Sequence, residues 1–173
     1  MKKQESYQNI NIMNENLKIL LEGLRKAREK YGDSPQKPAT SKEVEKLNKA
    51  VMENFNIELS PVYKSILLKT NGFNENGVFL YGSETNLIAG YSDRYLEGIM
   101  EANEIWREDD DFSNYLFYAE SDLYLFAQSL KDQLYSCRAR DSFDDVIFET
   151  NDDNDFFEKI FKLAFDDEFH MED

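Results

Sequence analysis

Residues 58–73 read ELSPVYKSILLKTNGF, and this stretch decides the fold because it predicts a short helix with both ends marked. Ser60 suits the N-cap position, since its hydroxyl can accept a hydrogen bond from a free amide of the first turn. Pro61 follows at the first helical position, where its missing N–H costs nothing and its fixed φ is already helical. The pair Asn71-Gly72 then supplies the left-handed residue that ends a helix. We therefore predict a helix over Pro61–Thr70.

A second amphipathic helix is predicted directly before this one. Residues 40–43 read Thr-Ser-Lys-Glu and fit a capping box, in which the threonine and glutamate side chains satisfy free amides. Apolar residues then recur at steps of three and four, at Val44, Leu47, Val51 and Phe55. We expect a helix over Ser41–Asn54, and apolar strand candidates follow the Asn-Gly stop.

This order of elements resembles the N-terminal half of the SUKH superfamily, which is typified by the yeast regulator of cell-wall glucan synthesis and by many bacterial immunity proteins. The family pattern is an amphipathic helix, then Leu-Pro-x-x-Tyr-x-x-Phe-Leu, then an Asn-Gly turn. Here the motif reads Leu59-Ser60-Pro61-Val62-Tyr63, with one extra residue before the proline. Ile66-Leu67 stands where Phe-Leu is usual.

The C-terminal half extends this resemblance. The run Asp153–Ile160 is similar to the family's closing helix, and Tyr118–Phe126 is similar to a hairpin that presents a strand of alternating aromatics. The similarity covers residues 41–165. It implies that residues 1–40 form an added N-terminal helix and loop, and that residues 166–173 form an acidic tail.

The expected fold class is α+β, a single domain with a mainly antiparallel sheet packed against helices. Apolar periodicity predicts a first helix over Asn14–Tyr31 and a closing helix over Asp155–Ala164, while Ser92–Trp106 leans helical. The expected strands are Gly77–Tyr81, Leu87–Ala89, Tyr115–Ala119, Asp122–Ala127 and Gln133–Arg138, with Val146–Phe148 as either a further short strand or an extended lead-in. The expected core residues are Leu47, Val51, Tyr63, Leu67, Phe79, Phe117, Phe126, Phe157, Ile160 and Phe161.

Charge is distributed unevenly along the 173 residues, whose net charge is −15. Residues 1–31 carry +3 and residues 32–70 carry +1, whereas residues 71–173 hold seven Lys or Arg against twenty-six Asp or Glu. A field of that sign repels nucleic acid and anionic membranes, and it attracts a cation or a basic protein surface. The alternative interpretation is an acidic surface that only maintains solubility.

Little in the sequence indicates catalysis. The single histidine, His170, has no placed partner for general base work, and we interpret it as a surface residue. Ser121 has no histidine to activate it, and we interpret it as a turn residue. The sequence lacks glycine-rich phosphate loops and a Gly-x-Ser-x-Gly elbow. We therefore expect a protein that is not an enzyme and that needs no cofactor.

Two runs of acidic residues, Glu108–Asp111 and Asp152–Asp155, contain the oxygen ligands that a hard cation prefers. The second run resembles part of a calcium loop, but it lacks the central glycine, and Leu163 stands where the loop needs a glutamate. We interpret both runs as loop and cap acids and predict no metal site. Glu101 and Glu104 are given no catalytic role, because paired carboxylates are expected by chance in this composition.

The protein is expected to be cytoplasmic. Met1-Lys2-Lys3 is followed by polar residues, which predicts no secretory signal, and no apolar run is long enough to cross a bilayer. Cys137 is the only cysteine, which excludes an internal disulfide and a multi-cysteine metal site. We expect it to be a small apolar residue within a strand.

The family resemblance implies an intracellular immunity protein that neutralises a toxin by binding it, and the acidic C-terminal half would suit a basic toxin domain such as a nuclease. The alternative is a regulatory or scaffold module of the same fold. A surface that binds a basic protein should combine carboxylates, which steer the encounter, with rigid aromatics, which hold the complex. The candidate residues are Asp109, Asp110, Asp111, Glu120, Asp122 and Tyr124. The competing interpretation of these residues is a solvated loop and turn with no partner.

Overall fold

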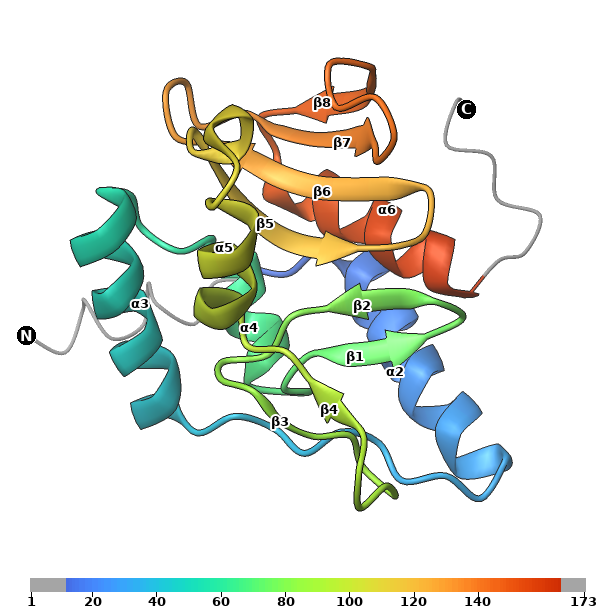
Figure 1. The fold of residues 1–173 in the computed structure, drawn as a ribbon. Helices are drawn as coiled ribbons and strands as arrows, with labels where there is room; N and C mark the ends of the chain where they lie inside the picture. Colours follow the sequence, from blue (N-terminus) through green and yellow to red (C-terminus); the bar gives the residue numbers. More distant parts are fainter. Residues whose placement is uncertain (1–11, 166–173) are drawn as a thin grey trace, which may run out of the picture.

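The computed structural model describes residues 12–165 and has at its centre a six-stranded antiparallel sheet in the order β1-β2-β5-β6-β7-β8 (Figure 1). The strands are β1 (Phe73–Glu75), β2 (Val78–Leu80), β5 (Tyr115–Glu120), β6 (Tyr124–Ser129), β7 (Tyr135–Ala139) and β8 (Val146–Thr150), and a separate hairpin joins β3 (Asn86–Leu87) to β4 (Tyr95–Leu96). The helices are α2 (Glu15–Lys30), α3 (Ser41–Phe55), α4 (Pro61–Leu67), α5 (Ile99–Trp106) and α6 (Asp153–Phe165), with a 3₁₀ turn η1 at Asp110–Phe112. The predicted α+β class and mainly antiparallel sheet are confirmed.

The helix starts follow the capping signals in the sequence. Thr40 Oγ1 accepts from the backbone N–H of Glu43 at 3.2 Å at the start of α3, and Ser60 Oγ accepts from Tyr63 N–H at 3.2 Å at the start of α4. Gly72 has a φ of 78°, as the Asn-Gly stop predicts. However, α4 ends at Leu67, three residues before the predicted end, and its C-cap Leu68 has a right-handed conformation. The prediction that Asn71-Gly72 ends this helix was therefore wrong, because the chain leaves α4 through a tight turn before it reaches Gly72.

One face of the sheet, covered by α4 and α6, forms the core. Tyr63 of α4 stacks on Phe157 of α6 with ring centroids 5.8 Å apart, and Tyr118 of β5 meets both rings edge-on. Nine of the ten predicted core residues are buried. Phe79 is the exception and the prediction was wrong, because its neighbours Val78 and Leu80 occupy the core face and the alternation of β2 turns Phe79 outward.

Helix α2 packs along α6 (Figure 1). Asn14, the N-cap of α2, donates from its side chain to Glu158 Oε1 at 2.9 Å, and its backbone N–H donates to Asn154 Oδ1 at 2.8 Å. At the other end of α2, Arg28 pairs with Glu75 at 2.7 Å. These contacts attach α2 to the sheet and to the closing helix at both of its ends.

The structure tests three local predictions, which concern Ser121, the start of β6 and Cys137. Ser121 is a turn residue, as expected, since its hydroxyl accepts from the N–H groups of Leu123 and Tyr124. That turn delays β6 to Tyr124, two residues after its predicted start. Cys137 is buried within β7, as expected.

The helix-prone stretch Ser92–Trp106 is helical only in part, and the predictions for the C-terminal residues are not tested. Only Ile99–Trp106 is helical within the helix-prone stretch, because Tyr95–Leu96 forms a strand that pairs with β3. The predictions for His170 and for the acidic tail concern residues outside the described part of the chain.

Candidate functional site

A cleft of about 350 Å³ lies on the sheet face opposite α6, where β2, the segment after β4 and the turn between β5 and β6 meet. We call it the acidic cleft, because three carboxylates line it against one guanidinium, together with three aromatic rings. Its lining residues are Gly77, Phe79, Tyr81, Tyr95, Glu97, Glu120, Ser121, Asp122 and Arg140.

The hydroxyl of Tyr81 is fixed at the edge of this cleft from two sides. It donates to Glu120 Oε1 at 3.1 Å and accepts from Trp106 Nε1–H at 2.9 Å. Trp106 is held in turn because Asn103, one turn earlier on α5, bonds to both the N–H and the C=O of Phe117 at 2.8 Å. Burial, and then the charge of Glu120, raises the pKa of Tyr81 well above its ordinary value, so the phenol stays protonated.

Glu120 is neutralised within the cleft by Arg140. Arg140 Nη1 donates to Glu120 Oε2 at 2.8 Å and to the backbone oxygen of Ser121 at 2.9 Å. The same guanidinium lies 5.4 Å from the ring centroid of Trp106, within the range of a cation–π contact. Glu120 therefore organises the wall of the cleft, and its charge is not available to a partner.

The uncompensated negative charge of the cleft comes from Glu97 and Asp122. Neither carboxylate has an ion-pair partner among residues 12–165. Burial, and then the charges of Glu120 and Glu101, raises the pKa of Glu97 above its ordinary value, which indicates that this carboxylate lacks a stabilising cation. A positive group placed beside Glu97 would relieve its repulsion by Glu120 and Glu101.

Two large hydrophobic side chains are exposed here: Tyr95 lines the cleft, and Leu123 is the chain neighbour of the lining residue Asp122. Tyr95 on β4 is 61% exposed, and Leu123, at the tip of the hairpin between β5 and β6, is 68% exposed. Leu123 follows Asp122 directly, and the backbone oxygen of Leu123 accepts from the backbone N–H of Arg140 at 2.9 Å. The rim thus presents apolar area beside uncompensated carboxylates, a combination that suits a protein contact better than bulk solvent.

The residues predicted from the sequence do not form one surface. Glu120 and Asp122 both line the acidic cleft. Tyr124 is two residues before Phe126, which packs on Phe156 of α6, so alternation places both side chains on the α6 face of the sheet, away from the cleft. Asp109–Asp111 lie in and beside η1, before β5 begins, whereas Glu120 ends that strand.

Sequence reasoning missed most of the cleft: Phe79, Tyr81, Tyr95, Glu97 and Arg140. The alternation of Phe79 and Tyr81 is visible in the sequence, but both neighbouring positions are also apolar, so the pattern does not say which face is buried. Glu97 and Arg140 arrive from segments far apart in the chain, and nothing local marks them.

The described residues offer no arrangement that indicates catalysis or metal binding. No group of three or more His, Cys, Asp or Glu side chains within residues 12–165 is placed to hold a metal ion. Asp152, in the run that resembled a calcium loop, instead accepts from the N–H of Asn154 at 2.9 Å at the start of α6. None of the helices in this part of the chain combines the length and apolar composition needed to span a bilayer.

Comparison with known proteins adds no assignment to this site. No protein-family model matches the chain, and no curated protein matches it. The chemistry of the acidic cleft and the pattern of the sequence are therefore the basis of the functional proposal.

Proposed function

We propose that this protein is a non-enzymatic immunity protein of SUKH type, which neutralises a cognate toxin by binding a basic surface of that toxin at the acidic cleft. The single observation that carries the cleft assignment is that Glu97 and Asp122, two carboxylates without an ion-pair partner among residues 12–165, line one cleft together with the exposed ring of Tyr95. The immunity role itself rests on the family resemblance of residues 41–165.

The cleft has the chemistry that a lysine or arginine of a partner needs. A cation in the cleft could form a charge-assisted contact with Glu97 or Asp122, and the rings of Phe79 and Tyr95 would add cation–π or apolar contact. The net charge of −15 would raise the association rate of a basic domain by electrostatic steering. Neutralisation by masking requires no catalytic group of this protein.

The experiment begins with the gene directly upstream of the one that encodes this protein. If it encodes a toxin, the toxin domain is expressed in bacteria with and without this protein, and survival is measured. We expect the wild-type protein to protect. A toxin-free neighbourhood, or survival that does not depend on this protein, would contradict the immunity role and would favour the regulatory or scaffold module.

Four variants connect protection to the cleft. We expect Asp122→Lys and Tyr95→Ala to reduce protection, because the first reverses an uncompensated charge and the second removes an exposed rim aromatic. Asp110→Lys and Tyr31→Ala are matched controls, since Asp110 and Tyr31 are exposed and lie outside the cleft lining. Equal protection by all four variants would refute the cleft as the binding site.

A further inference from the structure

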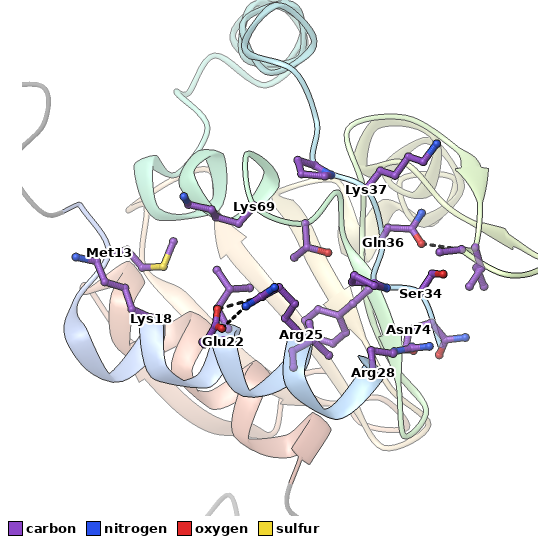
Figure 2. A pocket seen from close by; sticks show the side chains of 18 residues that line it. Met13, Lys18, Glu22, Arg25, Arg28, Ser34, Gln36, Lys37, Lys69 and Asn74 are labelled. Carbon is purple, nitrogen blue, oxygen red and sulfur yellow. Dashed lines mark hydrogen bonds and ion pairs between the residues drawn. The ribbon is translucent and has the colours of Figure 1, made fainter. Parts of the chain in front are cut away.

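A second cavity, of about 660 Å³, lies between α2, the loop over residues 33–39, the end of α4 and β1 (Figure 2). Its volume is within the range of sites that hold small molecules, and most of its lining is apolar. Met13, Leu24, Phe73 and Ile88 contribute buried side chains to this lining. The cavity shares no lining residue with the acidic cleft.

The rim of this cavity is basic, in a chain that is acidic as a whole. Five cationic side chains line the cavity against one carboxylate, that of Glu22; they are Lys18, Arg25, Arg28, Lys37 and Lys69. Figure 2 shows them distributed on α2 and on the segments that face it. Apolar walls with a cationic rim are complementary to a ligand that has an apolar body and an anionic group.

Two of these cations are available to a ligand. Arg25 pairs with Glu22 at 2.5 Å and with Glu29 at 3.1 Å, so its charge is compensated within α2. By contrast, the ammonium groups of Lys37 and Lys69 have no ion-pair partner among residues 12–165. The uncompensated positive charge among the lining residues therefore comes from these two lysines, which extend outward on different sides of the cavity in Figure 2.

Hydrogen bonds fix the wall that faces α2. The carbonyl oxygen of Lys37 accepts from the N–H of Asn71 at 2.9 Å, which joins the loop to the turn after α4. The side chain of Gln36 accepts from the N–H of Ala89 at 2.9 Å and donates to Asn86 Oδ1 at 2.6 Å. Because α2 is attached at both ends, the cavity exists before a ligand arrives, which reduces the cost of binding.

We propose that this cavity binds a small anionic amphiphile, a molecule with an apolar body for the interior and a carboxylate, sulfonate or phosphate group for the basic rim. This function is separate from toxin binding. It also gives α2 a role: the helix lies outside the part of the chain that resembles the SUKH superfamily, and it supplies one wall of the cavity.

The test compares two fluorescent probes that share an apolar body and differ in charge: anionic 8-anilinonaphthalene-1-sulfonate and uncharged N-phenyl-1-naphthylamine. At low ionic strength, we expect the anionic probe to bind with one-to-one stoichiometry and to be displaced by dodecanoate. Lys37→Gln combined with Lys69→Gln should weaken the anionic probe by about fivefold or more and the uncharged probe by less than about twofold. The control pair Lys42→Gln and Lys49→Gln, on α3 outside the cavity, should change neither probe.

A second variant tests the location without relying on charge. Ala89→Trp places a large ring at the cavity wall and should abolish binding of both probes, while circular dichroism stays that of the wild type. Probe binding that survives Ala89→Trp, or that responds equally to the two lysine pairs, would overturn the proposal. Self-association of the protein is measured by sedimentation velocity. If probe binding falls as the protein self-associates, a second copy of the chain occupies the cavity, and this result would also overturn the proposal.

Discussion

Substitution of Gly72 can separate the energetic cost of its positive φ from the cost of its close packing against β2. Its φ of 78° is a conformation that side chains rarely adopt, and a Cβ there would lie 2.5 Å from the backbone oxygen of Leu80 and 2.7 Å from Leu96 Cδ2. Gly77 has nearly the same φ, 76°, but a Cβ there would meet no atom within 4 Å. Gly77→Ala is therefore a matched control for Gly72→Ala.

The two substitutions share one cost and differ in a second. The left-handed backbone should cost each alanine about 1 kcal/mol, and the change in unfolded-state entropy is the same for both. Gly72→Ala must in addition displace the backbone of β2, and an overpacked site of this kind costs roughly 1–3 kcal/mol. We expect a total loss of about 3 kcal/mol for Gly72→Ala and about 1 kcal/mol for Gly77→Ala.

Urea denaturation followed by circular dichroism measures both values, and thermal melting provides a second readout. For a chain of this size, the difference of about 2 kcal/mol should lower the midpoint of Gly72→Ala by roughly 4–8 °C relative to Gly77→Ala. Equal losses of stability in the two variants would refute the close approach of Gly72 to β2, even if both were destabilised.

Two further predictions concern the capped helix and the buried titratable groups. Ser60→Ala should reduce the free energy of unfolding by about 1–2 kcal/mol, since Ser60 caps α4 and donates to Asp153 at 2.7 Å. Thr40 is an exposed cap, so Thr40→Ala should reduce the free energy of unfolding by less in the same urea titration. A larger loss for Thr40→Ala than for Ser60→Ala would contradict this account. Burial raises the pKa of Cys137 and of Tyr135 to about 12, from ordinary values of 9.0 and 10.0. Between those ordinary values and pH 12 the unfolded chain releases protons that the folded chain retains, so stability should be fully present below about pH 9 and should fall as the pH rises toward 12. A stability that is flat across this range in melts at stepped pH would contradict the burial of these groups.

The capped helices and the core were largely predictable, because their signals are local. The N-caps at Thr40 and Ser60 and the left-handed Gly72 each follow from the side chain or backbone of the residue itself. The nine core residues that were predicted correctly follow from apolar periodicity and from strand candidates that are apolar throughout. Phe79 failed because β2 is apolar on both faces, so alternation alone does not identify the core face.

The candidate site was much less predictable, since it depends on contacts between distant segments. Glu120 and Asp122 were found because the turn between β5 and β6 places acids beside a strand. Whether an acid is available to a partner depends on its neighbours: Arg140 compensates Glu120, whereas Asp122 has no ion-pair partner in the described part of the chain. Neither fact is visible in the local sequence.

The central claim is that the acidic cleft receives a basic partner. It is tested most directly by the association rate of the partner, first recovered by pull-down with the wild-type protein and identified by mass spectrometry. The rate is measured across a series of salt concentrations for the wild type, Asp122→Lys and Asp110→Lys. We predict a wild-type rate that falls as salt rises, a slower rate with a flatter salt dependence for Asp122→Lys, and a rate close to wild type for Asp110→Lys. Rates for Asp122→Lys that match the wild type at every salt concentration would contradict the claim.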